Sequence, residues 1–207
     1  MILVDREIKD GPCTSVSVAR TMTKRVEVYQ IKMTLRGSRP PIWRRIQVRS
    51  DITLARLHRI LQRVMGWTDT HLREFVIGGQ YYGIPGQDEG ERRKTKDERN
   101  YTLGEVVAAA SASFTYNYDF GDNWHHDLLI EATLPPKRGV RYPVCLAGAR
   151  ACPPEDVGGL SGYEDFLEAM RDPTHPEHRE FSEWIGGDFD PKAFDVGEVN
   201  QRLRSMR

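Results

Sequence analysis

The chain has 207 residues, of which 39% are hydrophobic and 29% are charged, as is ordinary for a globular protein that buries its own core. Thirty basic residues balance thirty acidic ones, so the net charge of zero argues against a protein that coats DNA or membranes through bulk electrostatics, while a local basic patch stays open. Three cysteines give no disulfide framework, and the apolar runs are too short to span a bilayer. We therefore expect a cytoplasmic protein without membrane association.

Residues 1–24 carry mixed charges, a Gly11-Pro12 pair and no sustained periodicity. This pattern predicts a disordered N-terminal extension, and translation starting at Met22 rather than Met1 is an open alternative. One domain is expected over residues 25–207.

Two alternating apolar runs, 29–35 and 42–48, flank a Gly/Pro-rich turn and predict a β-hairpin. A helix is predicted over residues 54–64, because its leucines recur at helical spacing between a Thr53 cap and a Gly66 stop.

The remaining elements follow from the same periodicities. They are a strand at 73–77, a polar loop at 85–100, a helix at 103–110, strands at 114–118 and 126–132, a loop at 141–159 and three C-terminal helical segments. This order predicts an α+β fold: a β-grasp-like mixed sheet with a helix across one face and additional C-terminal helices.

The densest polar cluster is formed by Asp119, Asp122, His125 and His126, around the Asp-Phe-Gly-Asp turn that also precedes Trp124. Carboxylates and imidazoles on a tight turn can bind a metal or exchange protons near neutral pH. Asp122 and His126 could converge if the turn folds back. The commoner alternative is that both aspartates accept hydrogen bonds from backbone amides and that His126 is a buried histidine bonded to a carboxylate.

A second cluster contains Cys145 and Cys152, whose thiolates could bind zinc together with His126 and Asp122. The six-residue gap between the cysteines is not the usual spacing of a zinc knuckle, so buried, inert thiols are the alternative. A third interpretation is that one of these cysteines is catalytic and is paired with His126.

The loop after Cys152 carries Glu155 and Asp156 and ends in Gly158-Gly159, a pair that would let a backbone approach a ligand closely. A rigid loop that docks the C-terminal helices is the alternative interpretation.

Arg44 shares the strand phase of the apolar residues around it, so its side chain is expected on the buried face. A buried arginine needs a partner, and Asp119 or Glu131 are the predicted ones. Binding of an anion in a cleft is the alternative.

Five stretches are specific enough to suggest a family: PPIWRRIQV, LARLHRILQRVMGWTDTHLREF, YNYDFGDNWHHDLLIE, PVCLAGARACPPEDVGGLSGYEDFLEAM and GGDFDPKAFD. In this order, over residues 29–204, the chain resembles the plasmid pRiA4b ORF-three-like family. The resemblance implies an α+β fold and a mobile-DNA context, since some members are labelled as insertion-sequence passenger proteins of a resolvase-like type. Members often carry a His-Leu-His stretch where this chain has His71-Leu72-Arg73.

Three functions remain open. The first is an accessory or interaction protein of a mobile element without chemistry of its own, bound to protein partners through an exposed apolar or aromatic patch. The second is a metal-binding protein or metal-dependent hydrolase that uses the cysteine cluster. The third is a nucleic-acid binder, for which Arg44 and four other basic residues should gather on one surface: Lys32, Arg36, Arg39 and Arg45.

Overall fold

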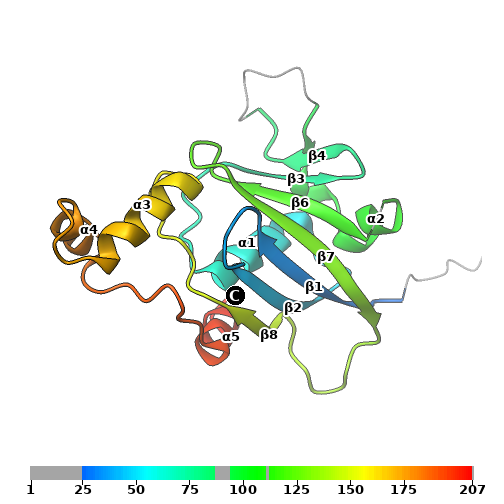
Figure 1. The fold of residues 1–207 in the computed structure, drawn as a ribbon. Coiled ribbons are helices and arrows are strands. Elements are labelled where there is room, and N and C mark those ends of the chain that lie inside the picture. Colours follow the sequence, from blue (N-terminus) through cyan, green and yellow to red (C-terminus); the bar gives the residue numbers. More distant parts are fainter. Residues whose placement is uncertain (1–24, 87–93, 111, 207) are drawn as a thin grey trace, which may run out of the picture.

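A computed structural model describes residues 25–86, 94–110 and 112–206. The predicted N-terminal extension, with Cys13, lies outside them. One eight-stranded sheet dominates the molecule, in the order β5-β4-β3-β6-β7-β1-β2-β8 (Figure 1). All neighbouring strands are antiparallel except β4 and β5. The strands are β1 Val28–Leu35, β2 Trp43–Arg49, β3 Arg73–Ile77, β4 Gln80–Gly83, β5 Lys96–Asp97, β6 Ser113–Tyr118, β7 Trp124–Leu134 and β8 Val144–Ala149.

Strand β1 lies inside the sheet, where it pairs with β2 on one side and β7 on the other. Its alternate residues Ile31, Met33 and Leu35 are buried, because successive strand residues point to opposite faces. In register, Met33 faces Arg44 on β2, and Leu35 faces His126 on β7. The predicted hairpin is confirmed, and Arg44 and His126 lie on the buried face.

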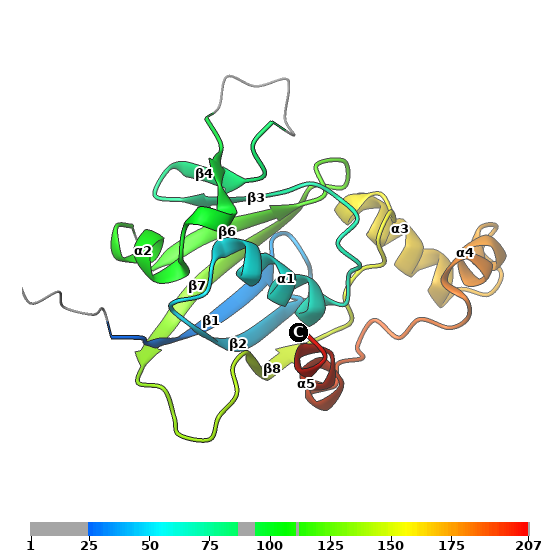
Figure 2. The ribbon, with the colours of Figure 1, turned by 180° about the vertical axis from the view of Figure 1, so that it is seen from behind.

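Helix α1, Leu54–Met65, covers this buried face (Figure 2). Thr53 begins the helix by accepting a hydrogen bond from the Arg56 amide, and Gly66 ends it in the left-handed conformation (φ 106°). The helix, both of its caps and its apolar stripe confirm the prediction. The α+β fold with a helix across one face of a mixed sheet is therefore confirmed.

Three strands were not predicted. β8 lies within the expected loop at 141–159, β5 lies within the expected loop at 85–100, and β4 follows the Gly78-Gly79 turn. β5 and β8 are the two edge strands and β4 lies next to β5, and all three are too short or too poor in β-branched residues to show a period of two. Their pairing comes from neighbouring strands and not from local pattern.

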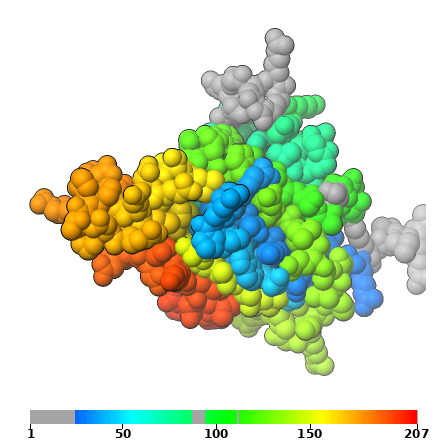
Figure 3. All heavy atoms as spheres, viewed as in Figure 1, coloured from blue at the N-terminus to red at the C-terminus, as the bar shows by residue number. Residues whose placement is uncertain are grey.

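Three more helices follow β8: α3 Gly159–Arg171, α4 His178–Ile185 and α5 Val196–Arg204. Helix α5 packs against β8 and α1, and Asn200 exchanges two hydrogen bonds with the Cys145 main chain. Helices α3 and α4 extend away from the sheet (Figures 1 and 3). The short helices before β6, η1 Glu98–Asn100 and α2 Leu103–Ala108, complete the fold. In the described ranges, no helix has the length and apolar character needed to cross a membrane.

Arg44 is 3% exposed, and its guanidinium joins three parts of this architecture. Its Nε donates to the Val64 carbonyl near the C-terminus of α1 at 3.2 Å, and its Nη1 donates to the carbonyls of Trp43 and Ala149, each at 2.9 Å. The predicted pairing with Asp119 or Glu131 is wrong, because Glu131 lies on the opposite face and binds Arg45. Carbonyl dipoles, including those at a helix C-terminus, stabilise the charge instead.

The free energy of unfolding of the Arg44→Lys variant should therefore be about 2–4 kcal/mol lower than that of the wild type, because an ammonium group cannot reproduce the several hydrogen bonds of a buried guanidinium. Urea denaturation measures this difference. The matched control is Arg45→Lys, one residue along on the solvent face, for which a loss of less than about 1 kcal/mol is expected. Equal losses in the two variants would contradict this role of Arg44.

Candidate functional site

Three segments that are distant in sequence meet at one end of the sheet. They are the connection between α1 and β3, which carries His71, the turn between β6 and β7, which begins at Asp119, and the loop between β8 and α3, which carries Asp156. Among the described His, Cys, Asp and Glu residues, these three form the one group whose ligand atoms all lie within 4.8 Å of one another. This group is the candidate site.

The turn at Asp119 positions the first carboxylate. Asp119 is 7% exposed and has a positive φ of 58°, an uncommon conformation outside glycine. Its Oδ1 accepts hydrogen bonds from the amides of Gly121 at 2.9 Å and Asp122 at 3.3 Å, and its own amide donates to Leu72 at 2.8 Å. These bonds leave Oδ2 facing His71, whose Nδ1 is 3.6 Å away.

The second carboxylate belongs to Asp156, whose side chain is 70% exposed, and whose φ is 60°. Its loop approaches the Asp119 turn closely: the Gly158 amide donates to Asp122 Oδ2 at 3.2 Å. At Gly159 a Cβ atom would lie 2.6 Å from the Asp122 carbonyl oxygen, so only glycine fits there. The glycine pair thus permits the close approach of this loop to the Asp122 turn, while its approach to a ligand stays a prediction.

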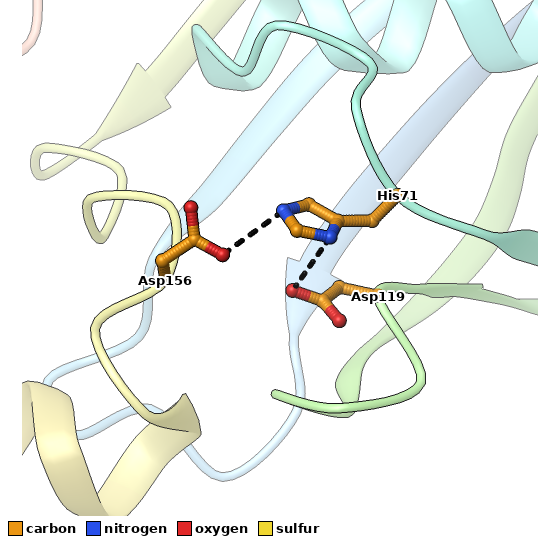
Figure 4. A group of neighbouring side chains, drawn as sticks. All are labelled: His71, Asp119 and Asp156. Carbon is orange, nitrogen blue, oxygen red and sulfur yellow. Dashed lines mark ion pairs between the residues drawn. The ribbon is translucent and has the colours of Figure 1, made fainter.

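His71 lies between the two carboxylates (Figure 4). Its Nε2 is 3.1 Å from Asp156 Oδ1 but forms no aligned hydrogen bond, although the atom is buried. A neutral imidazole has one N–H and can donate to only one carboxylate. The arrangement therefore has room for one more positive charge, either a second proton or a bound cation.

Glu155 holds these segments in place. Its Oε2 accepts hydrogen bonds from the Thr68 amide at 3.0 Å and the Thr68 hydroxyl at 2.5 Å, and its Oε1 accepts one from the Tyr118 hydroxyl at 2.5 Å. Burial, followed by the Glu155 contact, raises the pKa of Tyr118, so the phenol stays protonated and donating. Trp67 adds a hydrogen bond from its indole to the Pro153 carbonyl at 3.0 Å.

A buried polar network holds residues 69–73, the segment that carries His71. His58 on α1 contacts Asp69 through Nε2 at 2.6 Å and the Tyr116 hydroxyl through Nδ1 at 2.7 Å. Arg73 contacts the same Asp69 at 3.5 Å and the buried Glu98 at 2.9 Å. Burial lowers the pKa of His58 against the opposing effect of Asp69. The network fixes both ends of the segment 69–73 around His71.

Of the residues predicted for a site, Asp119 and Asp156 are brought together and Glu155 lies beside them. Both aspartates of the turn accept bonds from backbone amides, as the alternative interpretation held. The predicted convergence of Asp122 with His126 is wrong, since Asp122 faces Gly158 while His126 is fully buried in the core. Trp124 is also fully buried, where its ring packs against Trp67.

The predicted zinc set is not assembled. Cys145 lies on β8, where its thiol donates to the Ala147 carbonyl at 3.6 Å. His126 lies on β7, and strands β1 and β2 separate β7 from β8. Burial raises the pKa of both Cys145 and Cys152, as expected of inert thiols. His126 has the Tyr116 carbonyl as its partner at 3.3 Å, so the expected carboxylate partner is also wrong.

The basic surface expected of a nucleic-acid binder does not form. Arg44 is buried on the face covered by α1, Arg45 is paired with Glu131 at 2.6 Å, and Arg36 is paired with Asp127. Lys32 and Arg45 do lie side by side, since both cations sit over the Trp43 ring at 5.2 Å and 5.1 Å. Because Arg44 is buried and the other two arginines are paired with carboxylates, the five residues do not form one unpaired basic surface.

The comparison with known proteins agrees with the resemblance noted from the sequence. The family described as plasmid pRiA4b ORF-3-like protein matches residues 27–198. This chain belongs to that family.

Two relatives carry no functional description. The uncharacterized protein y4hQ of Sinorhizobium fredii is 42% identical over 181 residues, which cover 86% of this chain and 92% of the relative. The crystal structure of MM3350 from Methanosarcina mazei Go1, a protein of unknown function, matches with a TM-score of 0.76 at 39% identity. That match covers 85% of this chain and 99% of the other. The family thus fixes the fold, and any function has to be argued from the site.

His126 gives the fold a pH dependence. Burial lowers the pKa of His126 to about 4, below its ordinary value of 6.5. Between these pH values His126 is protonated in the unfolded chain but not in the folded one. The contribution of His126 to the free energy of unfolding is therefore full above pH 6.5 and falls as the pH is lowered towards 4.

The loss attributable to His126 at the lower limit is about 3 kcal/mol. Chemical denaturation at a series of pH values should show a shallower slope for His126→Phe than for the wild type, with His58 and the carboxyl groups of lowered pKa supplying the remaining slope. Identical slopes would show that His126 does not contribute.

Proposed function

We propose that this protein binds a divalent cation through His71, Asp119 and Asp156, as an accessory protein with a metal-dependent role. The observation that carries the proposal is the convergence of one imidazole and two carboxylates from three separate segments within 4.8 Å. The fit of a cation is judged from the donors themselves.

The donors fit a transition-metal ion better than calcium or magnesium. One nitrogen and two oxygen ligands suit zinc, manganese or iron, whereas calcium and magnesium prefer oxygen ligands alone. A cation would supply positive charge between the two carboxylates that flank His71. Zinc, which the sequence suggested with the cysteines, remains a candidate with this different ligand set.

The positions of the three ligands indicate what they would do. Asp119 is buried and held by two amides, so it would keep its place while His71 and the exposed Asp156 adjust to the ion. The positive φ of Asp119 and of Asp156 is a departure from ordinary backbone of the kind that clusters at functional sites.

The site is open on the side of Asp156, which leaves coordination positions for water or a substrate. A bound ion would supply Lewis acidity and a lowered pKa of a coordinated water, which is the chemistry of a metal-dependent hydrolase. Glu155 and Tyr118 would limit how the surrounding loops move.

Titration calorimetry with Zn²⁺ and Mn²⁺ on tag-free protein tests the proposal. Asp156→Asn, which removes an exposed carboxylate without touching the core, should weaken binding at least about tenfold. The matched control Asp188→Asn replaces another exposed aspartate outside the site and should bind as the wild type does. No saturable binding, or equal affinities in the two variants, would refute the assignment.

A second candidate, an interaction protein, is favoured by one observation. Trp184 on α4 is 47% exposed, and α4 has no buried residue. Its ring lies against Phe166 of α3, with the ring centroids 6.0 Å apart. A half-exposed tryptophan on a helix without buried residues is a candidate contact point for a partner protein.

A photo-crosslinking amino acid at position 184, introduced in host cells, should give a discrete adduct of fixed mass if Trp184 faces a partner protein. The same probe at the exposed Gln201 of α5 is the control and should give none. An adduct pattern that is the same at both positions would speak against a specific contact.

A further inference from the structure

A cavity of about 440 Å³ lies between the C-terminal end of α1, the segment 151–153 and the start of α5. Arg44 forms its buried floor, Trp67, Cys152 and Phe194 line its sides, and Arg202 contributes from α5. None of these residues belongs to the His71 cluster, so the cavity is a separate feature.

The charge of Arg44 is not neutralised in this cavity. Its hydrogen bonds use Nε and Nη1 and go to three main-chain carbonyls, while Nη2 donates to no residue in the described part of the chain. Phe194 covers one face of the guanidinium at 4.6 Å. No described carboxylate forms an ion pair with Arg44, which is 97% removed from solvent and therefore lacks the counter-charge that buried cations ordinarily have.

The neighbouring groups add to the positive charge. The guanidinium of Arg202 is close enough to lower the pKa of Arg44, although burial is the larger cause. The Nε of Arg202 donates to the Arg63 carbonyl at 3.2 Å and, like Arg44, not to a carboxylate. The nearby thiols of Cys145 and Cys152 are neutral, because burial raises the pKa of each. Two guanidinium groups thus share one cavity, and neither forms an ion pair with a carboxylate in the described part of the chain.

The other charged groups of the cavity decide the size of the anion. Asp195 and Glu198 also line it, and both are exposed, so they lie towards its mouth. Two carboxylates there would repel an extended polyanion such as a nucleic acid, whereas a small ion can pass them and reach Arg44. Asp195 is further engaged, since it caps α5 by accepting the Glu198 amide at 2.8 Å.

We infer that this cavity binds a small oxyanion, a carboxylate or a phosphate group, between Arg44 and Arg202. The free Nη2 of Arg44 supplies a charge-assisted hydrogen bond at the floor, and the planar guanidinium suits either oxyanion. The cavity volume leaves room for the small molecule that carries the oxyanion.

Calorimetric titrations with inorganic phosphate and with succinate, in buffer stripped of divalent cations and at constant ionic strength, test this inference. Arg44 supports the fold, so the informative variant is Arg202→Gln, which should weaken the binding of the preferred anion about tenfold. The matched control is Arg204→Gln, an exposed arginine on the same helix, which should bind as the wild type does.

The phosphate and succinate arms identify which oxyanion the site takes. Saturable binding of either one that depends on Arg202 supports the inference. Absence of binding to both, equal weakening by the two variants, or tighter binding of an oligonucleotide through Arg202 would overturn it. Because divalent cations are removed, failure here leaves the His71 proposal unaffected.

Discussion

The candidate site depends on the Glu155 carboxylate. Through its bonds to Thr68 and Tyr118 it joins the loop before α3 to the connection after α1 and to the end of β6. Together with the bond from the Gly158 amide to Asp122 and the bond from the Asp119 amide to Leu72, this bridge brings His71, Asp119 and Asp156 to one place. One partly buried carboxylate with several donors thus offsets the conformational entropy of three loops at once.

The buried cation Arg44 has the corresponding role for the body of the fold. It lies where β2, the C-terminal end of α1 and β8 converge, and Phe194 covers it from the segment before α5. Its compensation by carbonyl dipoles keeps the guanidinium in place without a carboxylate. Because Arg44 is held by carbonyl groups and not by a carboxylate, its charge is not neutralised where it faces the cavity. The residue that stabilises the packing is therefore also the one that could bind an anion.

Local patterns predicted much of the fold because they act over a few residues. The helix from Leu54, its Thr53 and Gly66 caps, and the alternation of β1 and β2 all follow from periodicity and cap chemistry. The edge strand β8 was missed because its stability comes from pairing with β2 and from Asn200, contacts that its own six residues do not encode.

The site was predicted only in part for a similar reason. Asp119 and Asp156 were named because turn and loop carboxylates stand out, but their meeting with His71 depends on tertiary contacts. One signal pointed to His71: the family resemblance marks a histidine stretch there, although this chain has Arg73 in place of its second histidine. Arg73 pairs with Glu98 and Asp69, so that position has become structural while His71 stays at the surface of the site.

The most direct test of the central claim is a crystal structure of the protein grown with Mn²⁺, with data collected for anomalous scattering. The account predicts an anomalous peak bonded to His71, Asp119 and Asp156, with water in the remaining positions. A peak at the cysteines or elsewhere, or none at this cluster while the protein is otherwise ordered, would contradict it.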